Sequence, residues 1–439
     1  MLVKILKSST LFAGLLLTSV AVAKPAPETD APVAAEAPVV ADAPSAAAPY
    51  LRTVDDAGRR VKLEITSRTF QPRDGKGPSV TLVGVAHIAD GTFYGRLQAL
   101  LDSHDVVLFE SVTPPGTNGA GGDTASARHE STVSALRFVG AVVAHYAAQT
   151  GAYPADLAEV KTYMHAKDSR LPHLIDRANR DAWARPFVYE RNADADGFTL
   201  MSLGSDGRSG GEDEAADLRL SDLDPLDPAM FADEDNLQAS LAHALDLDFQ
   251  LEAIDYDRPN WRCSDMSIDQ VQAAMAAAGG DFGPLQMALS GSSLPAKVMK
   301  LMLWLIKAAD AVTDGTVSSI FKVVLVEILG DPTVMEAGLG QMGDGFKEVI
   351  VDQRNQVVID DLKAIIDDEP EVKSVAIFYG AAHMVDMASR LDEQLGYDPS
   401  EETWYTAIEV DLEKANVPPR ELQRMRTMIR RAMAQQMRR

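Results

Sequence analysis

Two strand-like segments of the sequence end in the same way. "VTLVGVAH" closes at His87, and "VAIFYGAAH" closes at His383 near the other end of the chain. Each is a run of strand-forming residues followed by Gly-x-x-His and then by helical spacing. Helical spacing also covers residues 236–254, 294–312 and 347–368. This alternation predicts an α/β fold, α+β overall, with a mainly parallel sheet and flanking helices. Ligands bind beyond the carboxyl ends of parallel strands, so both histidines are expected in one site if their strands are neighbours.

Two further charged residues are expected near these histidines. Glu110 closes the strand-like segment "DVVLFE", which places a carboxylate at the same edge of the sheet. Arg354 lies in "DQRN", on a predicted amphipathic helix just before the second Gly-x-x-His strand. It could balance the charge of Glu110 or hold a substrate carboxylate or carbonyl. Two imidazoles and a carboxylate are a donor set that a catalytic metal accepts.

These motifs together resemble the TraB/PrgY–GumN–Tiki superfamily. The matching stretches are "GVAH", "VLFES", "DQRN" and "GAAH", within residues 50–125 and 219–412. The Tiki branch implies a metal-dependent protease that uses Mn²⁺ or Co²⁺, with Zn²⁺ as the alternative ion. On this resemblance His87, Glu110 and His383 are metal or catalytic residues, and Arg354 is an active-site arginine.

Three functions follow as hypotheses. The first is an exported metal-dependent hydrolase of peptides or proteins, in which Glu110 is either a metal ligand or the general base. The second is a non-catalytic module that binds haem or a peptide. The third is an accessory protein of a secretion system.

An insertion interrupts the predicted sheet between residues 128 and 218. Its helical segments and short strands lead into a loop rich in glycine and acidic residues, "LGSDGRSGGEDEAAD". Oxygen-rich loops of this kind suit calcium, and a solvated acidic turn is the alternative.

"YAAQTGAYP", "DAWARPFVY" and this loop resemble the soluble domain of the type II secretion major pseudopilin. That family implies a structural Ca²⁺ in the loop. The family's glycine after Asp-x-Trp is replaced here by Ala184. The prepilin N-terminus of the family is missing, so the insertion is expected to dock to secretion-system or envelope proteins, not to form filaments. The implied side-chain and carbonyl ligands are Asp206, Asp213, Asp217, Leu203 and Ser205.

The N-terminal residues predict export. A basic start, an apolar stretch and Ala21-Val22-Ala23 predict a cleaved signal peptide, with no transmembrane anchor afterwards and a periplasmic or secreted product. A net charge of −24 argues against nucleic acid as a partner. The sequence therefore divides into the signal peptide (1–23), a Pro/Ala-rich linker (24–49), the sheet domain in two parts (50–127 and 219–412), the insertion (128–218) and a basic C-terminal helix (413–439).

The other six histidines lack a second ligand at metal-like spacing and are left out of the predicted site: His104, His129, His145, His165, His173 and His243.

Overall fold

The computed structural model describes most of the chain between residues 39 and 431. The described residues are 39–41, 48–56, 58–114, 116–117, 121–122, 124–192, 194, 196–226, 237–280, 316–331, 345–415, 417–418, 420, 422–424, 426–428 and 431. The predicted signal peptide, the helical segment expected at 294–312 and most of the basic C-terminal helix lie outside these residues.

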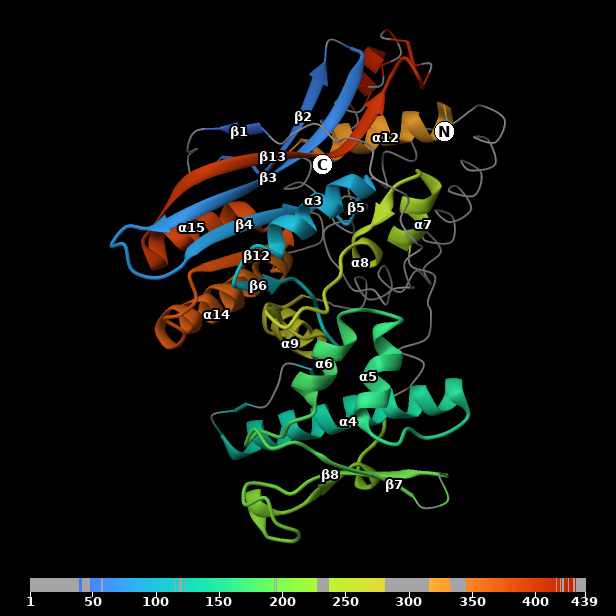
Figure 1. Cartoon of the computed structure of the whole chain (residues 1–439), viewed down its shortest axis with the longest axis vertical. Coiled ribbons are helices and arrows are strands. Elements are labelled where there is room, and N and C mark those ends of the chain that lie inside the picture. Colours follow the sequence, from blue (N-terminus) through green and yellow to red (C-terminus); the bar gives the residue numbers. More distant parts are fainter. Residues whose placement is uncertain are drawn as a thin grey trace.

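A mixed eight-stranded sheet forms the centre of the larger part of the molecule, the sheet domain (Figure 1). Its order is β1-β13-β3-β4-β12-β6-β11, with β2 paired to β3. The pairs β4–β12, β12–β6 and β6–β11 are parallel, and the other pairs are antiparallel. The expected α/β class, α+β overall, is confirmed. The sheet is mixed and not mainly parallel, because β1, β2, β3 and β13 add antiparallel pairs beside the parallel half that carries both Gly-x-x-His motifs. The strands are β1 (Val39–Ala41), β2 (Leu51–Asp56), β3 (Arg60–Pro72), β4 (Ser79–Val85), β6 (Val106–Phe109), β11 (Trp261–Cys263), β12 (Ser374–Gly380) and β13 (Tyr397–Asp411).

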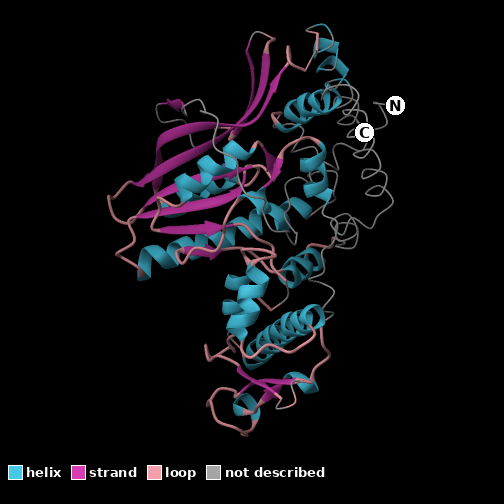
Figure 2. Ribbon diagram, turned by 45° about the vertical axis from the view of Figure 1, so that its right-hand side comes forward, coloured by secondary structure: helices cyan, strands magenta, loops and turns pink. Residues whose placement is uncertain are grey.

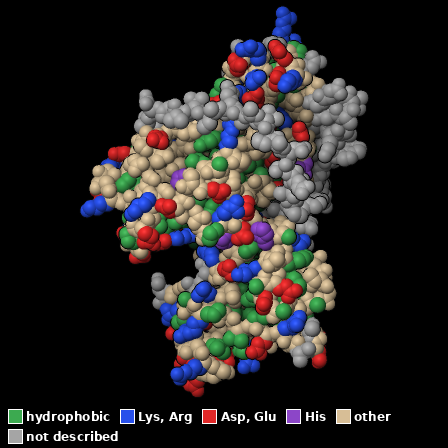
Figure 3. All heavy atoms as spheres, viewed as in Figure 1, with side chains coloured by type: hydrophobic (Ala, Val, Ile, Leu, Met, Phe, Trp, Pro, Cys, Tyr) green, Lys and Arg blue, Asp and Glu red, His purple; other side chains and the backbone are tan. Residues whose placement is uncertain are grey.

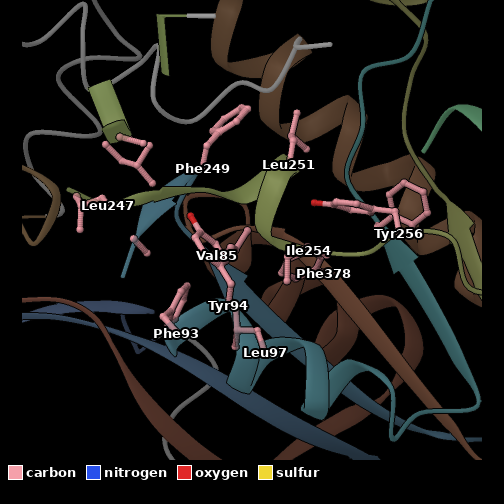
Figure 4. Close-up of a cluster of buried hydrophobic side chains, with 14 of the residues drawn as sticks. Val85, Phe93, Tyr94, Leu97, Leu247, Phe249, Leu251, Ile254, Tyr256 and Phe378 are labelled. Atoms are coloured by element: carbon pink, nitrogen blue, oxygen red, sulfur yellow. The ribbon is translucent and has the colours of Figure 1, made fainter. Parts of the chain in front are cut away.

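Helices cover both faces of this sheet (Figure 2). Side chains alternate along a strand, so Val106 and Leu108 of β6 pack with α14 and α15, while Val107 and Phe109 pack with α3 on the opposite face. The second face also carries the small ribbon of β5 and β10. Figure 4 shows this side of the core, with Val85 and Phe93 among its members. The remaining elements are β5 (Ile88–Ala89), α3 (Gly91–Leu101), α7 (Leu237–Ala244), β10 (Asp248–Phe249), α8 (Gln250–Ala253), α9 (Ile268–Ala277), α12 (Thr316–Leu329), α14 (Arg354–Asp368) and α15 (Met384–Leu395).

Three segments differ from the sequence expectation. The helix expected over 236–254 is split, because Asp248–Phe249 pairs with Ile88–Ala89 as a strand. The long helix expected over 347–368 begins with a π-helical turn at Glu348–Gln353, directly before the buried Arg354 and Asn355. Three residues of the expected linker form β1, because their extended backbone adds to the free edge of β13.

The insertion projects from one end of the sheet domain, with α5 and α6 between the sheet domain and α4 (Figure 1). Its buried side chains belong to the same hydrophobic cluster as those on the α3 face of the sheet. The insertion is therefore packed onto the sheet domain through a shared core. Its elements are α4 (Ala125–Thr150), α5 (Leu157–His165), α6 (Leu171–Ala178), β7 (Val188–Arg191), β8 (Phe198–Ser202), the 3₁₀ turns η1 (Asp213–Ala215) and η2 (Leu220–Asp222), and β9 (Leu218–Arg219).

In the portion of the chain that the structure covers, no helix is both long and apolar enough to cross a membrane.

Candidate functional site

The two Gly-x-x-His motifs lie side by side. Strands β4 and β12 are parallel neighbours, with Gly380 opposite Val85. The main chain continues this contact past the strand ends, because the Ala381 N–H donates to the Val85 carbonyl at 3.0 Å. Strand β12 also pairs with β6, and the Glu110 N–H donates to the Phe378 carbonyl at 3.0 Å. The sheet therefore brings His87, His383 and Glu110 to one edge, as the sequence predicted.

Gly84 of the first motif allows close packing of strands. Neither Gly84 nor Gly380 has a positive φ, so neither provides a left-handed turn. A Cβ on Gly84 would come within 3.0 Å of Ile65 Cγ2 and 3.2 Å of the Thr66 carbonyl on β3. This glycine is therefore explained by the close approach of the neighbouring strand.

His383 is held by Asn355 of α14. Asn355 Nδ2 donates to the His383 carbonyl at 3.1 Å and to Asp386 Oδ2 at 2.8 Å. Both partners are acceptors, so the amide orientation is determined and Asn355 Oδ1 faces His383 Nδ1 at 2.8 Å. The ring nitrogen Nδ1 must then carry the proton. In the neutral ring, Nε2 keeps a free lone pair, and it lies 3.8 Å from Glu110 Oε1.

His87 is held in a parallel way by Gln250 of α8. Gln250 Oε1 lies 2.8 Å from His87 Nδ1, and the Gln250 N–H donates to the His87 carbonyl at 2.8 Å. Gln250 Nε2 in turn donates to the Tyr256 hydroxyl at 2.8 Å. His87 Nε2 is buried and has no hydrogen-bond partner. Both histidines therefore have Nδ1 bonded to an amide oxygen, which leaves Nε2 for a ligand.

Glu110 and Arg354 form a buried ion pair with a third member, Asp265. Arg354 Nη2 donates to Glu110 Oε1 at 2.7 Å, and Gly380 N–H donates to Glu110 Oε2 at 2.7 Å. Asp265 binds the same guanidinium in a bidentate way, from Nε at 2.8 Å and from Nη2 at 2.7 Å. All three charged side chains are buried. Arg354 is thus occupied in holding two carboxylates, which leaves it poorly placed to bind a substrate.

Burial and charge set the protonation of this group. Burial disfavours the ionised form of Glu110, but the charge of Arg354 and the hydrogen bond from the Gly380 N–H favour it, and the pKa of Glu110 is lowered to about 2. Burial, aided by the charge of Arg354, lowers the pKa of His383 to about 4. At neutral pH the site therefore contains an ionised carboxylate and a neutral imidazole, the forms that bind metal ions.

These residues fit a metal only in part. Within the ranges that the structure describes, no three His, Cys, Asp or Glu side chains are grouped as a metal ion requires. The two Nε2 atoms are suitable nitrogen donors. Each Glu110 oxygen accepts one hydrogen bond in the contacts above and has a second lone pair. His87, His383 and Glu110 thus have donor atoms of the type that a divalent ion binds, but in this structure they are not arranged as a three-ligand metal site.

The acidic loop of the insertion has a different character. Its backbone folds on itself: Ser205 N–H donates to the Glu214 carbonyl at 2.8 Å, and Asp217 N–H to the Gly210 carbonyl at 3.2 Å. Asp206 and Asp213 are exposed, and Asp206 Oδ1 accepts from Arg208 N–H at 2.9 Å. Asp217 is mostly buried, and its Oδ1 has no hydrogen-bond partner. Of the expected ligands, Asp217 alone has a buried oxygen without a partner.

Three residues of the site were not found from the sequence. Asp265 follows the short strand β11, much as Glu110 follows β6, so an acidic residue after a buried strand was the available signal. Asn355 stands next to Arg354 in "DQRN". Gln250 has no such signal, because its contact with His87 depends on the pairing of β5 with β10.

Comparison with known proteins identifies only the insertion. Residues 121–221 match the family model of the type II secretion system protein G. The pseudopilin resemblance of this segment is thereby confirmed, and the matched range is slightly wider than the predicted one. Neither the curated proteins nor the solved structures contain a match to the chain. We conclude that this protein carries a domain similar to type II secretion protein G, packed against a sheet domain that these comparisons do not assign to a family.

Proposed function

We propose that the protein is an exported metal-dependent hydrolase that acts on peptide bonds. The observation that supports this most directly is the pair of buried imidazoles, His87 and His383, each with Nδ1 bonded to an amide oxygen. His87 Nε2 has no hydrogen-bond partner, and His383 Nε2 lies 3.8 Å from Glu110 Oε1. Such bonding orients an imidazole for metal binding through Nε2. The resemblance of the motifs to the TraB/PrgY–GumN–Tiki superfamily points to the same reaction class.

Each residue has a role in this proposal. His87, His383 and Glu110 would hold a divalent ion, Mn²⁺ or Co²⁺ by resemblance and Zn²⁺ as the alternative, and such an ion makes water more acidic and polarises a carbonyl. A carboxylate whose pKa is about 2 is a poor proton acceptor near pH 7, so we assign Glu110 as a ligand and not as the general base. Arg354 and Asp265 position Glu110.

Metal content and peptide cleavage test this function. The purified full-length protein should contain about one transition-metal ion per chain at the sheet site, and cleavage of a peptide library should depend on added Mn²⁺. His87→Gln and His383→Gln should each lose the metal and the cleavage while the far-ultraviolet circular dichroism spectrum is retained.

His104 provides the matched control. It is a half-buried histidine of the same domain, bonded to the Leu100 carbonyl and to Thr81, so His104→Gln should keep the metal. Metal without any cleavage would favour the alternative of a binding module. A metal-free wild-type protein that remains inactive with added Mn²⁺ or Co²⁺ would contradict the proposal.

A second proposal concerns the insertion, and it depends on Asp217. The buried oxygen of Asp217 without a partner, in a loop of aspartates and main-chain carbonyls, supports a structural Ca²⁺ held with Asp206, Asp213 and the carbonyls of Leu203 and Ser205.

Acidic and basic side chains are interspersed over one face of the insertion (Figure 3). Binding of a secretion-system or envelope protein there is the docking role that we propose. Pull-down of envelope proteins by the full chain, with and without Ca²⁺, tests this role. The absence of a specific partner in both conditions would count against it.

A further inference from the structure

We propose that the insertion positions His87, but not His383, through hydrogen bonds that pass from α6 through Tyr256 and Gln250. The two histidines look equivalent in the sequence. In the structure their supporting amides are held by different parts of the chain, and only one of these parts is the insertion.

The insertion holds the main chain of Tyr256 on both sides. The Tyr256 N–H donates to Ser169 Oγ at 3.1 Å, in the turn that leads into α6. The Tyr256 carbonyl accepts from His173 Nε2 on α6 at 2.9 Å. The Phe109 ring, next to Glu110 in the chain, lies 5.1 Å from the Tyr256 ring and 6.4 Å from the His173 ring, measured between centroids.

A buried ion pair anchors the turn that carries Ser169. Arg170 Nη2 lies 2.6 Å from Asp168 Oδ2, and Arg170 Nη1 donates to Ser111 Oγ at 3.0 Å. Ser111 directly follows Glu110. All these side chains are buried, so the turn is fixed against the sheet domain beside the site. On α6, which follows this turn, Arg177 Nη1 also donates to the Cys263 carbonyl at 2.6 Å.

Tyr256 passes this constraint to His87. Its hydroxyl accepts from Gln250 Nε2, and this hydrogen bond holds the Gln250 amide with Oε1 facing His87 Nδ1. With Nε2 on the hydroxyl, Oε1 receives the His87 Nδ1 proton. Without the hydroxyl the amide can rotate, and His87 can then hold its proton on either nitrogen.

His383 has a separate support. Its amide partner, Asn355, bonds to the His383 carbonyl and to Asp386, all on α14, α15 and the turn before α15. These residues belong to the sheet domain. His383 is therefore an internal reference for any change that begins in the insertion. The consequence for catalysis rests on the proposed function, because a partner bound to the insertion would then act on the site through His87.

The tautomers of the two histidines test this inference. The full chain is labelled with ¹⁵N-histidine and treated with a chelator, and long-range ¹H–¹⁵N spectra distinguish Nδ1–H from Nε2–H rings. His87→Gln and His383→Gln assign the two signals. In the wild type both rings should be Nδ1–H. In Tyr256→Phe and in Ser169→Ala, the His87 signals should shift toward a tautomer mixture while the His383 signals stay in place.

Two control variants distinguish a specific effect on the position of His87 from a general loss of structure. Thr162→Ala removes an exposed hydroxyl from the same insertion and should change neither histidine. Ser169→Thr keeps the hydroxyl and should restore the wild-type His87 signals. If Tyr256→Phe does not fold, the Ser169 variants decide, because Ser169 is only half-buried. Unchanged His87 signals in a folded Ser169→Ala protein, or equal shifts of His87 and His383, would overturn the inference. The spectra need neither metal nor substrate, so failure of the hydrolase proposal would leave this result interpretable.

Discussion

The sheet-edge site and the acidic loop of the insertion were both predicted as metal sites, and they are built in opposite ways. The site gathers residues from distant parts of the chain, and its charged groups are buried and bonded to one another. The residues of the loop all lie within the single segment 203–217, and most of its carboxylates face solvent. The comparison shows that the site is ordered by buried charged side chains bonded to one another. The loop is ordered by backbone turns together with bonds from Arg128 to Glu214 and from Arg185 to the Gly204 carbonyl.

The largest expected effect on this comparison is the loss of unfolding free energy when the Asp265 carboxylate is removed. Asp265→Ala leaves the buried Arg354 with one carboxylate instead of two, and loss of one partner of a buried pair costs about 3–5 kcal/mol of unfolding free energy. Urea denaturation measures the change. Glu369→Ala is the matched control, because the Arg262–Glu369 pair is partly exposed and should cost less than about 1 kcal/mol. Equal effects of the two variants would show that burial of the site does not matter.

The second-largest expected effect is a loss of unfolding free energy in acid. The pKa of His383 is about 4, below its ordinary value of 6.5, so the unfolded chain takes up a proton before the folded chain does. The stability that depends on this difference is complete above pH 6.5 and is lost as pH falls toward 4, by about 3 kcal/mol. Denaturation curves of the chelator-treated protein from pH 8 to 4 measure it. His383→Gln should have a shallower fall below pH 6.5 and the wild-type slope between pH 7 and 8; identical slopes throughout would refute this reading.

Calcium should stabilise the loop by a smaller amount. Ca²⁺ at a hundred times its dissociation constant adds about 2.7 kcal/mol to the unfolding free energy of the unit that binds it. Thermal denaturation with Ca²⁺ and with a chelator measures the gain. Asp217→Asn should abolish it, because it replaces the buried oxygen that has no partner, while Asp222→Asn, outside the loop, should retain it. A Ca²⁺ effect that survives Asp217→Asn would place the ion elsewhere.

The smallest expected effect is at Ala184. This residue has a φ of 62°, in the left-handed region that favours glycine, and glycine is what the resembling family has there. Ala184→Gly should raise the stability of the insertion by about 1 kcal/mol, and thermal denaturation measures it. Ala182→Gly, two residues earlier and without a positive φ, should not stabilise the protein. A destabilised Ala184→Gly protein would show that the turn carries no strain.

Much of the site could be predicted from local sequence. Buried strands followed by Gly-x-x-His, and an acid after "VVLF", are local patterns, and the structure places His87, His383 and Glu110 at one edge. The pseudopilin resemblance of the insertion was likewise readable, because its turns depend on residues close together in the chain.

Other features depended on contacts between distant segments. Arg354 was predicted as a residue that could balance Glu110 or bind substrate, and the structure gives it to Glu110 and Asp265. The insertion was expected to interrupt the sheet domain, and the structure adds that the two share one hydrophobic cluster. Neither outcome could follow from spacing, because both depend on which surfaces meet.

The sequence by itself determined the strands that carry His87, Glu110 and His383, their polar endings and the family resemblance of the insertion, because each depends on neighbouring residues. Only the tertiary structure decided which amide holds which histidine. Gln250 reaches His87 because β10 pairs with β5, and Tyr256 reaches Gln250 from a segment that α6 holds in place. A hydrogen bond requires two groups about 3 Å apart, and only the folded chain brings groups from such distant segments that close.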